Sequence, residues 1–529
     1  MRSIMRLCLH HLIEEAAARD GAAPALVYRT GTLSYAELWR QARGFGAALG
    51  ALGLERGERV AIYLEKRIET VVAIFGASVA GAVFVPVNPL LRPAQVGHIL
   101  ADCDVRVLVT SPDRLAQLRE ALGDCPALDH VILVDEEAGD GSAARHVPYA
   151  LHGWGEFDAL GDAAFQAPAR IDLDMAAILY TSGSTGKPKG VVLSHRNLLV
   201  GAESVSHYLG NTKDDVILSV LPLSFDAGLS QLTTGFSAGA LVVLANYLLP
   251  GDVVKLCARH GVTGLTCVPP LWAQLAAQRW PEEASGRLRY FANTGGRMPR
   301  ALLARLRGHF PKARPFLMYG LTEAFRSTYL DPAEIDRRPD SIGKAIPNAE
   351  ILVLRPDGSP CEAGEEGELV HRGALVALGY WNDPVRTDER FRPLGAQPSG
   401  LHAERAVFSG DVVRADADGF LYFVGRRDEM IKTSGYRVSP TEIEEVAYAT
   451  GLVREAAAFG VEDEERGQRV VLVASATDAG PLDEAALLVA MRPHLPHYML
   501  PSRVIARDGL PISPNGKFDR ARLRMELAP

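Results

Sequence analysis

The sequence predicts an α/β protein with a large N-terminal domain of layered α/β sheets, a small β-barrel-like part, and a small α+β C-terminal domain. Strand-like and helix-like segments alternate over the first ~420 residues, as they do around a largely parallel sheet. From about residue 350, strands are separated by D-G or single-glycine turns, a pattern typical of a meander or small barrel. The last ~100 residues follow the order helix, strand, strand, helix, strand, which indicates a separate α+β domain.

Size and composition are those of an ordinary globular protein with more than one domain. The chain has 529 residues, of which 47% are hydrophobic and 23% charged. The formal net charge of −8 argues against a nucleic-acid partner, because such partners favour a basic face. The six cysteines are scattered without a C-x-x-C pair, so we expect buried, reduced thiols.

The N-terminal stretch predicts an amphipathic helix rather than an export signal. His10, His11, Glu14 and Glu15 interrupt the apolar run that a signal peptide requires. We therefore expect a cytoplasmic protein.

The first strands follow in order. Apolar strands are predicted at Arg59–Leu64, Val105–Thr110 and Asp129–Asp135. The uncharged stretch Thr70–Val87 is split by a glycine and ends near a proline, so a buried helix followed by a buried strand fits it better than a membrane span. Residues 136–168 are predicted to form a surface connection.

The later elements follow a different pattern. Strands are predicted within residues 350–360, 367–373 and 419–426. A helix then starts after a charged stretch, with Ser439 or Thr441 as its N-cap. The predicted domains are therefore residues 1–427 and 428–529.

A loop between two apolar strands carries the most specific chemical signal. The strand Ala176–Tyr180 leads into a loop rich in hydroxyls, glycines and lysines, which suit phosphate oxygens. Ser194 is placed to cap the next helix. The loop residues are Thr181, Ser182, Gly183, Ser184, Thr185, Gly186, Lys187, Lys189 and Gly190.

Two other nucleotide-binding motifs do not fit this loop. The Walker P-loop, G-x-x-x-x-G-K-[ST], requires a glycine where Thr181 stands and a hydroxyl where Pro188 stands. No G-x-G-x-x-G follows an early strand, so a dinucleotide fold has no support.

The loop closely resembles that of the adenylate-forming superfamily, which includes acyl-CoA synthetases, peptide-synthetase adenylation domains and luciferases. The resemblance extends from about Leu7 to Met525 and includes the motifs NTGGR, MYGLTEAFRS, FSGDVV, GRRDEMIKTSGYRVSPTEIE and NGKFDR in the family's order. The nearest subgroups are stand-alone prolyl-carrier-protein ligases and acyl-CoA-ligase-like proteins associated with exosortase systems.

The resemblance implies ATP and Mg²⁺ as cofactors and assigns roles to individual residues. Lys517, Thr181 and Glu323 are the implied catalytic residues, with Glu323 also holding Mg²⁺. Asp428, Lys432 and Gly435 form the implied hinge and thiol path. The implied ATP-binding residues are Thr181, Ser182, Gly183, Ser184, Thr185, Gly186, Lys189, Gly295, Tyr319, Gly320, Thr322, Asp411 and Arg426.

The segment Leu221–Leu232 offers the substrate clue. Its Phe-Asp pair resembles amino-acid-activating domains, in which the aspartate pairs with the substrate's ammonium. A buried carboxylate needs a cationic partner, so Asp226 favours an amino acid such as L-proline unless Arg326 neutralises it. The predicted substrate pocket comprises Phe225, Asp226, Ala227, Ser230, Cys267, Thr294, Met318 and Arg326.

The predicted reaction is formation of an acyl-adenylate from a small carboxylate, followed by transfer to a phosphopantetheine thiol of a carrier protein. The alternative is an AMP-forming acyl-CoA synthetase that uses CoA and a non-amino acid. A non-catalytic nucleotide-binding regulator and a P-loop-type ATPase are weaker alternatives. We expect no nucleic acid and no membrane span.

Overall fold

The computed structural model describes residues 6–135, 148–156, 165–181, 188–395, 404–427, 429–433, 436–463, 467–477 and 480–527. The chain divides into two compact units. The first unit combines residues 1–248, 321–326 and 373–392, and the second combines 249–320, 327–372 and 393–529. The predicted division between residues 427 and 428 stays a prediction, since Asp428 lies outside the described residues.

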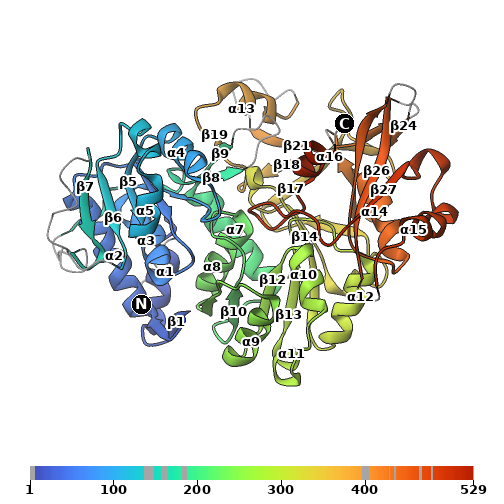
Figure 1. Ribbon diagram of the computed structural model, residues 1–529. Helices are drawn as coiled ribbons and strands as arrows, with labels where there is room; N and C mark the ends of the chain where they lie inside the picture. The colour runs from blue at the N-terminus through green and yellow to red at the C-terminus, as the bar shows by residue number, and fades with distance from the viewer. Residues whose placement is uncertain are drawn as a thin grey trace. The chain divides into compact units, whose positions relative to one another are not determined.

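The first unit is built around a mostly parallel sheet in the order β19-β9-β8-β4-β3-β5-β6-β7 (Figure 1). Its parallel pairs include β3 with β4, β3 with β5 and β4 with β8, so these strands end at one edge. The strands are β3 (Arg59–Tyr63), β4 (Val83–Pro86), β5 (Val105–Thr110), β6 (His130–Leu133), β7 (Ala150–Gly153), β8 (Met175–Thr181), β9 (Lys189–Ser194) and β19 (Gly379–Tyr380).

These bounds confirm the strands predicted in this region. The predicted connection at 136–168 differs, because it contains β7, which pairs in parallel with β6 at the edge of the sheet. A second set of strands in this unit runs β10-β11-β1-β2. They are β1 (Pro24–Tyr28), β2 (Gly31–Ser34), β10 (Val216–Ser219) and β11 (Leu241–Leu244).

Close helix packing and capping explain the helices of the first unit. A Cβ on Gly46 of α2 would lie 2.7 Å from the side chain of Val79 in α3, so glycine permits the close approach. The Ser194 hydroxyl accepts from the Asn197 amide, which confirms the predicted cap of α7. The helices are α1 (His11–Asp20), α2 (Tyr35–Ala51), α3 (Ile68–Ala80), α4 (Pro93–Asp102), α5 (Pro112–Leu118), α7 (His195–Leu209), α8 (Asp226–Ala238) and α13 (Pro384–Arg390).

The second unit contains strands in the order β17-β18-β21-β22-β16-β15-β14-β13-β12. β12, β13 and β14 are parallel, whereas β14 to β16 are antiparallel. β21 pairs antiparallel with both β18 and β22, which agrees with the meander predicted from about residue 350. The strands are β12 (Gly264–Cys267), β13 (Tyr290–Asn293), β14 (Arg314–Tyr319), β15 (Thr328–Leu330), β16 (Ser341–Ala345), β17 (Ala349–Leu354), β18 (Glu366–Gly373), β21 (Arg405–Ala415) and β22 (Leu421–Arg426). The helices are α9 (Pro250–His260), α10 (Pro269–Ala276), α11 (Glu282–Arg287) and α12 (Arg300–His309).

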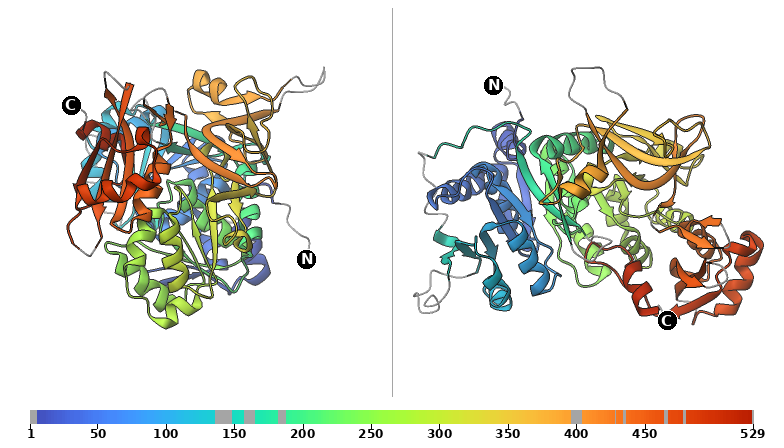
Figure 2. Two further views of the ribbon diagram at one scale, coloured as in Figure 1. Left: turned by 90° about the vertical axis from the view of Figure 1, so that its right-hand side faces the viewer. Right: turned by 90° about the horizontal axis from the view of Figure 1, so that it is seen from above.

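The last part of the second unit is the predicted small α+β fold, drawn in orange and red in Figure 2. The predicted order of helix, strand, strand, helix and strand is confirmed by α14 (Pro440–Ala449), β25 (Val453–Asp463), β26 (Gly467–Ala476), α15 (Glu484–Met491) and β27 (Arg503–Arg507). Ser439 precedes α14 as predicted, yet its hydroxyl donates to the Val424 carbonyl and makes no capping bond. Also present are β23 (Ile431–Thr433), β24 (Tyr436–Val438) and α16 (Arg520–Leu527).

The cysteines behave as the sequence predicted. All six are free thiols, and every one except Cys361 is buried. Burial raises the pKa of Cys103 and of Cys257 to about 12, so both thiols are protonated and unreactive at neutral pH. Over the described residues, no helix has the length and apolar character needed to cross a membrane.

Candidate active site

The two ends of the predicted phosphate loop are held together by the β8–β9 hairpin. Thr181, the last residue of β8, pairs with Lys189, the first residue of β9. Ser182, Gly183, Ser184, Thr185, Gly186 and Lys187 lie outside the described residues. The Thr181 hydroxyl is buried and has no hydrogen-bond partner within the described part of the chain. A buried hydroxyl in that state suits a bound ligand oxygen.

Lys189 meets the predicted metal ligand in the first unit. The Lys189 ammonium donates to Glu323 Oε1 at 3.0 Å and to the Tyr380 hydroxyl at 2.7 Å. The Tyr380 hydroxyl donates to the same Glu323 oxygen at 2.6 Å. The ammonium also lies 4.2 Å from the centre of the Tyr380 ring, within cation–π range. A lysine, a carboxylate and a phenol therefore form one closed cluster.

The electrostatics keep Glu323 ionised. Burial by itself would raise the pKa of this carboxyl, but Lys189, Arg390 and the Tyr380 hydrogen bond lower it to about 2. A buried, ionised carboxylate that bonds through one oxygen retains a second oxygen for a cation. Mg²⁺ commonly takes one or two protein carboxylates together with substrate phosphates and water. The residues present at Glu323 therefore fit Mg²⁺ bound with a nucleotide.

The structure adds two residues that the sequence reasoning missed. Tyr380 ends β19, which pairs with β9, and the Ala377 amide donates to the Glu323 carbonyl at 2.9 Å. Arg390 at the end of α13 has a buried Nε without a partner among the described residues. Tyr380 stands in the motif GYWNDP, in which an aromatic residue ends a strand just before a helix start; the motif marks these elements but not the contact with Glu323.

Asp226 and Arg326 meet inside the first unit. Arg326 Nη1 lies 3.4 Å from Asp226 Oδ2, and the two side chains are only 2% and 3% exposed. Two buried opposite charges at this separation neutralise one another. The condition on which the amino-acid hypothesis depended, an Asp226 without a protein cation, is therefore not met. Phe225, Ala227 and Ser230 are likewise buried around the start of α8.

The residues predicted to hold adenine and ribose come together in the second unit. Asp411 of β21 pairs across the sheet with Arg426 of β22, and their charged groups lie 3.6 Å apart. The Tyr319 hydroxyl donates to the Asp411 carboxylate. Burial, and next the charge of Asp411, raise the pKa of Tyr319 well above its usual value. Gly295 has a φ of 75°, which glycine adopts without strain. Thr322, which belongs to the first unit, is buried.

Three predicted pocket residues lie at the ends of neighbouring parallel strands in the second unit. Cys267 ends β12 and pairs with Asn293 of β13, the residue before Thr294. Asn293 also pairs with Leu317 of β14, the residue before Met318. The carboxyl ends of parallel strands are the usual ligand-binding edge of such sheets. The topology thus brings together positions 51 residues apart in sequence (267 to 318).

Lys517 lies on an exposed turn in the same unit. The turn is closed by a bond from the Ser513 amide to the Lys517 carbonyl at 2.6 Å. Next to it, a Cβ on Gly516 would lie 3.2 Å from Val268, the residue after Cys267. This turn therefore packs beside the β12 end of the predicted pocket. Lys432 is exposed on β23, whereas Asp428 and Gly435 lie outside the described residues.

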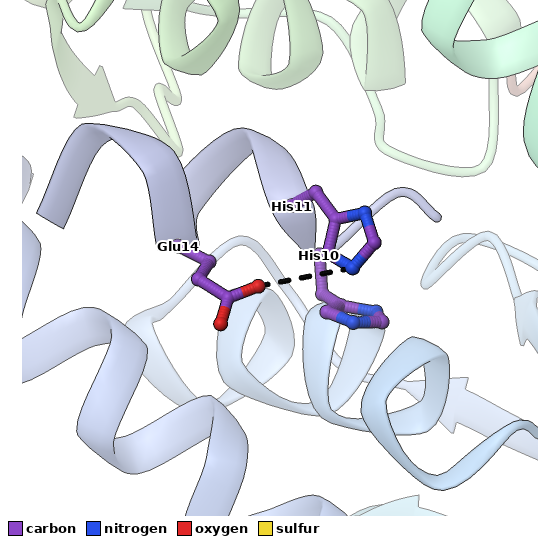
Figure 3. Close-up of side chains that lie close together, drawn as sticks. All are labelled: His10, His11 and Glu14. Atoms are coloured by element: carbon purple, nitrogen blue, oxygen red, sulfur yellow. Dashed lines mark ion pairs between the residues drawn. The ribbon is translucent and has the colours of Figure 1, made fainter. Parts of the chain in front are cut away.

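A histidine pair outside this region needs a separate assessment as a metal site. His10, His11 and Glu14 bring possible ligand atoms within 4.8 Å of one another (Figure 3). The Leu7 and Cys8 amides donate to His11 Nδ1 at 3.0 and 3.2 Å, which places the proton of the neutral ring on Nε2, facing Glu14. A metal at Nε2 would require loss of that proton. The cluster is therefore better explained as a contact that fixes residues 7 and 8 against the first turn of α1, with Glu14 beside the His11 ring.

Two family models match the chain. The AMP-binding enzyme model matches residues 13–381, and the model of the AMP-binding enzyme C-terminal domain matches residues 442–517. The first of these covers well over half of the chain. The phosphate loop, NTGGR and MYGLTEAFRS lie within the first range, NGKFDR overlaps the end of the second, and FSGDVV lies between the two ranges.

Curated relatives agree with these matches. A long-chain-fatty-acid–CoA ligase of Salmonella typhimurium is 30% identical, with 98% of this chain and 94% of the relative covered. A linear gramicidin synthase of Brevibacillus parabrevis is 29% identical over 98% of this chain, but the chain spans only 10% of that much longer protein.

Solved structures share the fold. The crystal structure of ATP-bound MatB from Rhodopseudomonas palustris aligns with a TM-score of 0.85 and 26% identity, covering 98% of each chain. This likeness extends over both units and confirms the predicted fold class of layered α/β sheets with a small C-terminal domain.

Proposed function

The chain belongs to the family of AMP-binding enzymes, the AMP-forming acid–thiol ligases, and on that premise we propose that it activates a small carboxylic acid with ATP and Mg²⁺ and transfers it to CoA. The observation that carries the ATP-dependent step is the cluster of Lys189, Glu323 and Tyr380 at the base of the phosphate loop. It combines an ammonium for phosphate oxygens with an ionised carboxylate for a divalent cation.

The first half-reaction is attack of a substrate carboxylate oxygen on the α-phosphorus of ATP, with loss of pyrophosphate. Mg²⁺ would supply charge neutralisation for the phosphates and would be held by Glu323. Lys189 and the Thr181 hydroxyl would bind phosphate oxygens, and the Lys517 ammonium would bridge the carboxylate and the α-phosphate. Asp411 would accept hydrogen bonds from the ribose hydroxyls. Catalysis then consists of positioning and electrostatic stabilisation.

The buried pair of Asp226 and Arg326 favours an acid without an amino group. An ammonium substrate would have to displace Arg326 from Asp226 and leave the guanidinium buried without its counter-ion, which is costly. A substrate that offers only its carboxylate leaves the pair intact. We therefore place a non-amino carboxylic acid ahead of L-proline and other amino acids.

A cavity in the first unit favours CoA as the thiol acceptor. It measures about 1010 Å³, and its charged lining residues are four arginines and three acids: Arg29, Arg67, Arg92, Arg114, Glu65, Asp113 and Asp135. Arg67 and Arg114 are fixed by carboxylates, whereas Arg29 and Arg92 form no ion pair within the described part of the chain. Guanidinium groups bind phosphates strongly, and the nucleotide end of CoA carries several.

The cavity is also on the correct edge of the sheet. Tyr63 and Ser111 line it at the carboxyl ends of β3 and β5, and Thr181 ends β8, which runs parallel to β4 in the same sheet. The end of β8, where the phosphate loop begins, thus lies on the same edge of the sheet as the cavity. A carrier-protein thiol is the second candidate acceptor, favoured by the likeness to a linear gramicidin synthase.

Two assays test the proposal. Carboxylate-dependent pyrophosphate exchange is measured over fatty acids, other small acids, L-proline and further amino acids, followed by transfer to CoA or to a holo-carrier protein. We expect exchange with a non-amino acid and a thioester to CoA. Arg92→Ala should raise the KM for CoA and leave pyrophosphate exchange unchanged. Exchange with amino acids alone, or transfer only to a carrier protein, would contradict the assigned substrate class or acceptor.

A further inference from the structure

The contacts of Glu323 assign a role to a residue outside the predicted site. We propose that Tyr380 is a positioning residue that holds the Glu323 carboxylate and the Lys189 ammonium together before nucleotide binds, and keeps Glu323 oriented when Lys189 moves to the nucleotide's phosphates and Mg²⁺ replaces it. This inference rests on the proposed use of ATP with Mg²⁺.

The geometry shows that the tyrosine hydroxyl joins the two charged groups. It donates to Glu323 Oε1 at 2.6 Å and accepts from the Lys189 ammonium at 2.7 Å, while that ammonium lies 3.0 Å from the same carboxylate oxygen. The three groups form a triangle in which each touches the other two. When Lys189 leaves, the tyrosine is the neutral donor that remains on Glu323.

The backbone holds Tyr380 at a fixed place relative to both partners. Tyr380 pairs with Val191 of β9, the strand that begins with Lys189. The Trp381 amide donates to the Gly190 carbonyl at 2.8 Å, and the Ala377 amide donates to the Glu323 carbonyl at 2.9 Å. The segment 377–381 therefore bonds to the main chain on either side of the cluster. Because the backbone already fixes the Tyr380 hydroxyl, little conformational entropy is lost when it holds Glu323 during the exchange of cations.

The charges of the cluster indicate why such an exchange is needed. Lys189 and Arg390 act electrostatically on Glu323, so two cations surround one carboxylate. The net positive charge attracts a polyphosphate, but a divalent cation approaching Glu323 is repelled until the phosphates attract Lys189 away. Nucleotide and metal are therefore expected to bind cooperatively, and Tyr380 preserves the metal-binding carboxylate during the exchange.

The test is calorimetric titration of ATP into the full chain, with and without Mg²⁺, in the absence of a carboxylic acid. Tyr380→Phe keeps the ring, its edge contact with Phe391 and the cation–π contact, and removes only the hydroxyl. We expect its Kd for ATP with Mg²⁺ to rise about tenfold, the effect of losing ~1.4 kcal/mol. The Kd for ATP without Mg²⁺ should change less than twofold.

A matched control and a double variant separate positioning from a structural effect. Tyr35→Phe removes another buried tyrosine hydroxyl, which donates to the Ala240 carbonyl at 2.7 Å, and should leave both Kd values unchanged. In a Glu323→Gln background, the further change Tyr380→Phe should alter the Kd with Mg²⁺ less than twofold, because the carboxylate it positions is gone. In exchange assays, the KM for Mg²⁺ with ATP should rise while the KM for the carboxylic acid is unchanged.

The outcomes separate this inference from the proposed function. An unchanged Mg²⁺ dependence in Tyr380→Phe, or an equal effect of that change in both backgrounds, would overturn the role of Tyr380. A wild-type protein that binds ATP with Mg²⁺ but catalyses no carboxylate-dependent exchange would refute the ligase proposal alone. Wild-type protein that binds no ATP would refute both.

Discussion

The buried pair of Asp226 and Arg326 offers a sharp test of how the predicted substrate pocket is charged. Their charged atoms are 3.4 Å apart and both side chains are almost fully buried. At an effective dielectric constant of about 20, the attraction at this separation is about 5 kcal/mol. Asp226→Asn leaves the Arg326 guanidinium buried without this counter-ion. Arg326→Met leaves the Asp226 carboxylate buried without its cationic partner. Each should lower the free energy of unfolding by about 3–5 kcal/mol.

The double variant distinguishes a true pair from two independent effects. Asp226→Asn with Arg326→Met leaves no buried charge, so its loss should be smaller than the sum of the single losses by about 1–3 kcal/mol. The assay is urea unfolding followed by fluorescence, with pyrophosphate exchange as a functional readout. A loss of stability in the double variant equal to the sum of the two single losses would refute the pairing. If the double variant activated the same acids as the wild type with unchanged preference, the pair would not govern substrate choice.

Other changes test further elements of the structure. Burial lowers the pKa of His371 from 6.5 to about 4, and its Nδ1 lies 2.9 Å from the Ser327 hydroxyl. As the pH falls through 6.5, the unfolded chain therefore binds a proton at His371 before the folded chain does. His371 should thus cost about 2 kcal/mol of stability at pH 5 relative to pH 7, and in His371→Gln that part of the acid sensitivity should vanish in urea unfolding at the two pH values. Ser194→Ala removes the cap of α7 and should lower the free energy of unfolding by about 1 kcal/mol. The control is Ser502→Ala, which removes a hydroxyl that donates to the Val470 carbonyl; an equal loss of stability in both variants would count against the cap. Lys517→Ala should slow pyrophosphate exchange at least about a hundredfold and leave ATP affinity nearly unchanged, and normal exchange would remove Lys517 from the catalytic residues.

The fold was largely predictable because its signals are local. Apolar runs such as Arg59–Leu64 and the glycine after the helix that begins at Ile68 mark element ends directly, and the αL conformation of Gly81 at φ 82° agrees with that prediction. The strand β7 escaped prediction because it is only four residues long and half-exposed, so it lacks an apolar pattern. Its formation depends on pairing with β6, which the local sequence does not encode.

The sequence motifs name the residues of the candidate site, but they do not indicate which of these residues touch one another. The Asp411 and Arg426 motifs lie on paired strands, as their spacing permits, but the pairing itself is a tertiary fact. Tyr380 was missed because it lies 57 residues after Glu323 and 191 after Lys189, and nothing in the local sequence indicates that its hydroxyl meets them. Ser439 shows the reverse case: it precedes α14 as predicted, but its hydroxyl donates to the Val424 carbonyl and accepts no hydrogen bond from the helix.

The three predicted pocket positions at the ends of β12, β13 and β14 share a property that bears on how such an edge can change during evolution. The hydrogen bonds that join these strands are made by the main chain, so a new side chain at Cys267, Thr294 or Met318 leaves the ladder unbroken. Neighbouring strands are about 4.8 Å apart, so the three side chains lie on one edge of the sheet. A change at any one of them alters that edge without breaking the strand pairing, so the edge can vary in sequence while the fold stays the same.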